Sequence, residues 1–85
     1  MAREERELIA PDSPLAPDIS VNPGRMSGVP CFKDTRVPVQ TLFDYLSAGD
    51  TLDEFLDGFP NVLREQAVRV LKLAGMGLLQ GLSNL

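Results

Sequence analysis

Five basic residues are candidates for contact with DNA or with a protein partner. Arg64, Arg69 and Lys72 lie mostly on the outer face of an amphipathic segment near the end of the chain. If this segment is a DNA-recognition helix, Arg64 is placed for a base edge, and Arg69 and Lys72 are placed for phosphates. Lys33 and Arg36 flank a predicted turn and are candidates for contact with a protein partner. Ordinary solvated faces would produce the same pattern, so both interpretations stay open.

Residues suited to catalysis or metal binding are few. The 85 residues include no histidine, the commonest general base and metal ligand. Asp53 and Asp57 are four residues apart on a predicted exposed helix face, which is more simply a solubilising surface than a cation site. The chain has neither a glycine-rich phosphate loop nor a nucleophile elbow, and its one cysteine, Cys31, suits a buried strand position. We therefore expect no enzyme activity, no cofactor and no bound metal.

The charges are segregated along the chain. The net charge of −4 argues against a nucleic-acid binder that works by charge alone. Residues 42–60 contain five acids and no base, whereas residues 19–41 and 61–85 each contain three bases and one acid. This distribution is compatible with one face for DNA and another for a basic partner. No apolar run approaches the ~20 residues of a membrane span and no signal-peptide pattern is present, so we expect a cytoplasmic protein.

Apolar residues at helical spacing predict three short helices joined by tight turns. The first follows Pro38 and ends before Gly49. The second follows Thr51, which begins a capping box, and stops at a Gly-Phe-Pro turn over residues 58–60. The third is expected from about Asn61 to about Ala74. This pattern predicts a mainly α fold with a trihelical helix-turn-helix core.

A short β-hairpin is predicted before the helices. Cys31-Phe32 and Arg36-Val37 would form its strands, with Asp34 at a turn position that tolerates a left-handed conformation. Ile19-Ser20-Val21 could form a further short strand. Residues 1–18 are predicted to be an extended arm, because prolines at every third position from 11 to 17 favour extended geometry.

Residues 75–85 form an apolar tail that contains three glycines. Each glycine costs about 1 kcal/mol of helix propensity relative to alanine, but Leu78, Leu79 and Leu82 favour burial. We therefore expect a frayed helix that orders against a partner or a second copy of the chain. A tail folded back on its own core is the alternative.

Motifs spaced over residues 19–74 resemble those of a small prokaryotic family catalogued as domain of unknown function 433. They are Ile19-Ser20-Val21-Asn22-Pro23, Gly28-Val29-Pro30-Cys31-Phe32, Thr35-Arg36-Val37-Pro38-Val39, residues 48–56, Phe59-Pro60 and Glu65-Gln66-Ala67-Val68. The resemblance implies a homeodomain-like helix-turn-helix and a VapB-type antitoxin role beside a PIN-like ribonuclease. Asp34 replaces the family's usual glycine. Leu63 replaces its usual capping residue, so the cap of the last helix is expected to shift to Asn61.

The resemblance and the charges together suggest one mechanism. The domain would bind and neutralise a PIN-like toxin through Lys33, Arg36, Leu78, Leu79 and Leu82. As a homodimer it would also repress its operon by binding operator DNA. The alternative is a protein-interaction module that does not bind DNA, which the acidic second helix favours. Arg36 has a structural alternative of its own, in which it hydrogen-bonds loop carbonyls and holds the hairpin.

Overall fold

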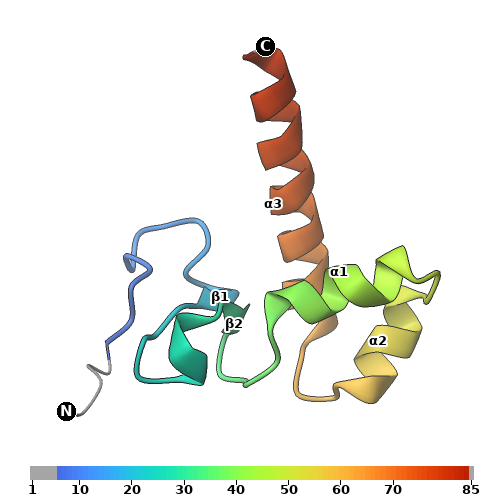
Figure 1. Ribbon diagram of the computed structural model, residues 1–85, viewed down its shortest axis with the longest axis horizontal. Coiled ribbons are helices and arrows are strands. Elements are labelled where there is room, and N and C mark those ends of the chain that lie inside the picture. The colour runs from blue at the N-terminus through green and yellow to red at the C-terminus, as the bar shows by residue number, and fades with distance from the viewer. Residues whose placement is uncertain (1–5, 85) are drawn as a thin grey trace.

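The computed structural model describes residues 6–84 and places three α-helices after a small antiparallel sheet (Figure 1). Its elements are β1 (Ile19–Ser20), the 3-10 turn η1 (Met26–Gly28), β2 (Cys31–Phe32), α1 (Val39–Ser47), α2 (Leu52–Gly58) and α3 (Arg64–Ser83). The predicted mainly α, trihelical architecture is therefore confirmed. Residues 1–5 of the predicted arm and residue 85 of the predicted tail lie outside the described residues. No helix in the described part is long and apolar enough to cross a membrane.

The strand pairing differs from the predicted hairpin. β2 pairs along its length with β1, with Ile19 opposite Phe32. The segment predicted as the second hairpin strand, Arg36-Val37, is not a strand, and the chain there pairs with β2 only at an isolated bridge between Cys31 and Pro38. Proline has no backbone N–H, so it cannot extend the ladder in this direction. The turn itself is as predicted, with Asp34 at a φ of 62°.

The first two helices begin and end where local sequence signals place them. Thr51 caps α2: its hydroxyl accepts from the Glu54 amide at 3.1 Å, and its own amide donates to the Glu54 carboxylate at 3.0 Å. This is the predicted capping box. After α1 the chain reverses at Gly49, whose φ of 97° suits glycine because a side chain would be strained there.

The third helix is longer than predicted and begins later. It starts at Arg64, with Leu63 as a cap residue that has no side-chain hydrogen bond, so the predicted start and cap at Asn61 are wrong. Instead, the side-chain oxygen of Gln66 accepts from the Leu63 amide at 3.0 Å. The helix also continues past the predicted end at Ala74 to Ser83. Leucine, methionine and glutamine between the glycines are strong helix formers and maintain the helix.

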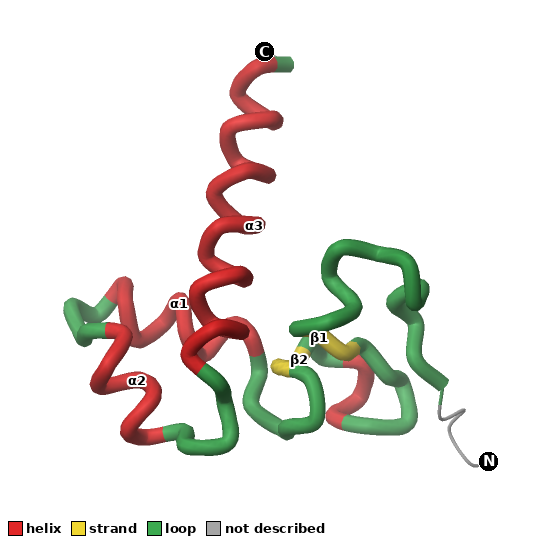
Figure 2. Tube along the Cα trace, turned by 180° about the vertical axis from the view of Figure 1, so that it is seen from behind, coloured by secondary structure: helices red, strands yellow, loops and turns green. Residues whose placement is uncertain are grey.

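The core lies where β2, the first two helices and the N-terminal half of α3 meet. Its buried apolar residues are Phe32, Leu42, Phe55, Val62, Ala67 and Val70. Phe55 is at its centre and contacts the rings of Tyr45 and Phe59 at centroid distances of 5.6 and 5.1 Å. The C-terminal half of α3 leaves this core and projects from the domain (Figure 2). Residues 74–84 are all exposed.

Candidate interaction surfaces

The projecting half of α3 carries an apolar surface. Leu78 and Leu79 are each 65% exposed and Leu82 is 53% exposed, so the three leucines predicted to contact a partner lie together on one helix. Met76 is also exposed. Residues 73–85 contain no charged side chain. Exposed leucines without neighbouring charges form an apolar patch of the kind that is found at interaction sites.

This apolar surface continues the face of α3 that packs into the core. Ala67 and Val70 are buried, and Leu71 packs against the core. Leu78 and Leu82 follow Leu71 by seven and eleven residues, which places them on the same side of the helix. The helix therefore has one apolar face of which only the N-terminal half is covered by the domain itself.

Arg69, predicted to contact phosphate, is bound to a carboxylate of the chain's own N-terminal arm. Its Nε donates to Oδ1 and Oδ2 of Asp18 at 3.0 and 2.8 Å, and its Nη2 donates to Oδ1 at 2.8 Å. Asp18 is 1% exposed. Hydrogen bonds to Asp18 raise the pKa of Arg69 above its ordinary value, and the charges of Asp18 and Glu65 act in the same direction. The arm thus fixes the Arg69 guanidinium against the domain.

Arg64 is also paired within the chain. Its Nη2 donates to a carboxylate oxygen of Asp53 on α2, in an exposed ion pair. Among the residues predicted to contact DNA, only Lys72 has no ion pair with a described residue. The structure therefore does not gather three free cations on α3, and places the acids of α2 beside the helix start.

Lys33 and Arg36, which the sequence grouped as partner-binding residues, lie in different surroundings. The Lys33 side chain lines a hollow beside the arm, together with Glu7 and Ile9. The Lys33 amide donates to the Asp18 carbonyl at 2.8 Å, which joins the arm to the turn after β2. Arg36 lines a separate hollow on the far side of the turn. Only Arg36 is thus placed for contacts away from the arm.

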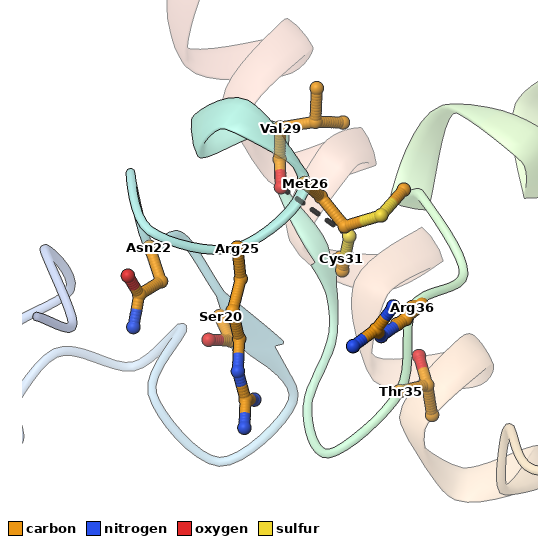
Figure 3. Close-up of a pocket in the computed structure, with 8 residues that line it drawn as sticks. All are labelled: Ser20, Asn22, Arg25, Met26, Val29, Cys31, Thr35 and Arg36. Atoms are coloured by element: carbon orange, nitrogen blue, oxygen red, sulfur yellow. Dashed lines mark hydrogen bonds between the residues drawn. The ribbon is translucent and has the colours of Figure 1, made fainter. Parts of the chain in front are cut away.

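The hollow beside Arg36 is also lined by Arg25, which is not among the residues predicted to bind a partner (Figure 3). It is lined by Ser20, Asn22, Arg25, Met26, Val29, Cys31, Thr35 and Arg36. Arg25 directly follows Asn22-Pro23-Gly24, whose residue types are typical of a turn. A basic residue directly after such a turn was the available signal, but its proximity to Arg36 depends on the β1–β2 pairing, which local patterns did not predict.

Beside this hollow, the Thr35 side chain has a structural role. The Thr35 hydroxyl donates to the Phe32 carbonyl at 2.8 Å and accepts from the Val37 amide at 3.1 Å, so Thr35 holds the turn. No hydrogen bond joins the Arg36 side chain to a carbonyl of the described residues. This differs from the alternative prediction that Arg36 holds the hairpin by hydrogen bonds to loop carbonyls. Cys31 is buried at the base of the hollow, where burial raises the pKa of its thiol.

A family model described as protein of unknown function (DUF433) matches residues 19–74. The chain belongs to this family. The match spans both strands, α1, α2 and α3 as far as Ala74, so the projecting segment and Asp18 lie outside it. Comparisons with curated proteins and with solved structures give no significant match. Within residues 6–84, no cluster of three or more His, Cys, Asp or Glu side chains could hold a metal ion.

Proposed function

We propose that the chain is the antitoxin-like component of a VapBC-type pair and binds a PIN-like ribonuclease through the apolar end of α3. The observation that supports this most is the exposed surface of Leu78, Leu79 and Leu82 on a helix that projects from the domain. A helix with apolar residues at i, i+1 and i+4 is suited to insertion in a hydrophobic groove of another protein. Docking there would extend the apolar contacts that α3 already makes with its own core.

The projecting segment is suited to tight binding because it is already helical. A segment that must fold on contact loses free energy to chain ordering, which typically costs 2–5 kcal/mol or more. Residues 74–83 are in helical conformation as a continuation of the anchored half of α3. Most of this ordering cost is therefore avoided, and the burial of the leucines can appear as affinity.

The ion pairs of α3 favour protein binding over operator binding. Recognition of DNA by this helix would require Arg64 and Arg69 to exchange Asp53 and Asp18 for phosphates or base edges. Asp18 is buried, so loss of its guanidinium partner would leave an uncompensated carboxylate. The acids of α2 and the net charge of −4 add repulsion toward a polyanion. We therefore propose a protein-binding role without repression of an operon.

Expression of the chain with the PIN-like protein of the adjacent reading frame tests this function. We expect a complex that persists through size-exclusion chromatography and a ribonuclease activity that falls when the chain is added. In mobility-shift assays on the upstream DNA, we expect no retardation by the chain between about 50 and 200 mM salt, the range over which phosphate-dependent binding would change most. A wild-type chain that neither binds nor inhibits the nuclease would refute the proposal.

A further inference from the structure

We propose that Arg25 and Arg36 form a second binding site, specific for carboxylate side chains on an acidic segment of a protein partner. This site is separate from the apolar end of α3, and it rests on the proposed function only in that the nuclease is the protein expected to present the acidic segment. Three features support this site: the two arginines line the same hollow, neither has an ion pair or a side-chain hydrogen bond with residues 6–84, and apolar residues lie beside them.

Both arginines border two neighbouring hollows of the surface. The hollow of Figure 3 contains Arg25 and Arg36 together with the Thr35 side chain. A second, shallower hollow is lined by Arg25, Asp34, Thr35, Arg36 and Asn61. Residues eleven positions apart in the sequence thus share one concave region, because the loop after β1 and the turn after β2 lie side by side. A group that enters this region lies beside both arginines.

Neither guanidinium has a partner in the part of the chain that the structure describes. Arg64 and Arg69 each form an ion pair, whereas Arg25 and Arg36 form no side-chain hydrogen bond or ion pair with the described residues. A guanidinium presents five N–H donors in a planar fork that matches the two oxygens of a carboxylate. Asp34 is the one acid that lines either hollow among the described residues, so positive charge is in excess there.

The backbone at Arg25 is held in place by local hydrogen bonds. The Arg25 amide donates to the Asn22 carbonyl at 2.9 Å, and the Arg25 carbonyl accepts from the Gly28 amide at 3.0 Å. Positive φ angles occur at Met26 and Ser27 beside Arg25, at 48° and 55°. Such conformations are costly for non-glycine residues and often occur at binding sites, where the surrounding structure maintains them.

The surroundings of the arginines favour a protein ligand over nucleic acid. Met26 and Val29 line the same hollow and are 40% and 41% exposed. Arginine and methionine are enriched in protein–protein interfaces, where an apolar contact accompanies the charged one. A nucleic-acid strand would bring many phosphates toward a chain of net charge −4. One or two carboxylates on a protein would meet the local positive charge without this repulsion.

The test is a titration of the ¹⁵N-labelled full chain with an acetylated tetraglutamate peptide at constant ionic strength, followed by NMR. We expect saturable shifts confined to amides around Arg25, Met26, Thr35 and Arg36. We expect none with the tetraglutamine peptide. The double variant Arg25→Gln/Arg36→Gln should bind the peptide at least tenfold more weakly than wild type. Away from the two substitutions, the NMR spectrum of this variant should match that of wild type. Lys72→Gln, which removes an exposed charge elsewhere, should leave that affinity within twofold of wild type.

Two results would overturn the inference. The first is that the peptide shifts no amide signals, shifts signals over the whole surface, or still shifts the same signals in the double variant. The other is a single-stranded oligonucleotide that perturbs the same amides at lower concentration than the peptide, which would assign the site to nucleic acid. The proposed function fails in a different way, by the absence of a nuclease complex with the wild-type chain, and the peptide titration does not depend on that complex.

Discussion

Replacement of the three exposed leucines of α3 by glutamine should abolish tight binding of the nuclease without unfolding the chain. In Leu78→Gln/Leu79→Gln/Leu82→Gln each new side chain has a helix propensity close to that of leucine. The leucines are 65%, 65% and 53% exposed, so their replacement removes little buried surface from the free chain. We therefore expect a far-UV circular dichroism spectrum like that of wild type and a stability within about 0.5 kcal/mol of it.

The size of the binding effect follows from the exposed leucine surface. Full burial of a leucine side chain gains about 1.5–3 kcal/mol, so burial of the half to two thirds still exposed here gains about 1–2 kcal/mol per residue. Loss of all three contacts then weakens binding by about 3–5 kcal/mol, which is roughly a hundredfold to a few thousandfold in Kd. The losses of translational and rotational freedom are the same for variant and wild type and cancel in the comparison.

Isothermal titration calorimetry of the triple variant against the purified nuclease measures this effect. Leu63→Gln is a matched control, because Leu63 is 59% exposed but precedes the other end of α3. A triple variant that binds within threefold of wild type would refute the assignment, and so would an equal loss in the control. If sedimentation instead shows that the three changes convert a dimer of the free chain into monomers, the leucines serve self-association.

Four further results are expected. Asp18→Asn should lower the melting temperature and speed hydrogen exchange around residues 15–19, because it removes the charge that Arg69 binds, whereas the exposed Asp12→Asn should change neither. Thr51→Ala should cost about 1 kcal/mol, seen as a melting temperature about 4–8 °C lower, and Thr51→Ser should restore most of it. Burial raises the pKa of Glu7, but hydrogen bonds from Ser20 and from two backbone amides outweigh it, so the pKa is lowered from 4.5. The hydrogen bonds of the Glu7 carboxylate should then hold the arm fully above pH 4.5 and be lost as the pH falls through the lower pKa of the folded chain. The NMR signal of the Val21 amide, which donates to Glu7, reports this transition. The same transition in Glu7→Gln would contradict this. Finally, burial of Cys31 should make its alkylation by iodoacetamide much slower in the folded chain than in denaturant, as followed by mass spectrometry.

The helices could be predicted from sequence because their signals are local. The capping box at Thr51 and Glu54 lies within four residues, and Gly49 terminates α1 in the adjacent turn. The start of α3 was predicted too early because Asn61 is a good cap by residue type. In the structure, Val62 is buried and its amide donates to the Phe59 carbonyl, so the chain is still turning after Asn61. Burial of one side chain thus overrides a local preference.

Two features of the candidate interaction surfaces could not be predicted, because they depend on contacts between residues that are far apart in the sequence. Asp18 and Arg69 are 51 residues apart, and their pairing requires that the end of the arm lie beside α3. Asp18 had no property in the sequence that distinguished it from the other acids of the arm. The neighbourhood of Arg25 and Arg36 likewise depends on which segment pairs with β2. By contrast, the leucine surface was predictable, because Leu78, Leu79 and Leu82 follow the core residues of α3 at helical spacing.

The arm and the projecting helix are linked through Arg69. Arg69 lies five residues before Ala74, at the boundary between the half of α3 that packs in the core and the half that is exposed. Its bonds to Asp18 hold the helix from the side opposite to that of the core residue Ala67. A helix fixed on both sides at its base presents its free end in one direction, which reduces the entropy lost when a partner binds. In the proposed function, the Asp18 carboxylate that pairs with Arg69 would therefore both disfavour DNA binding by this arginine and hold the leucines in position for a protein partner.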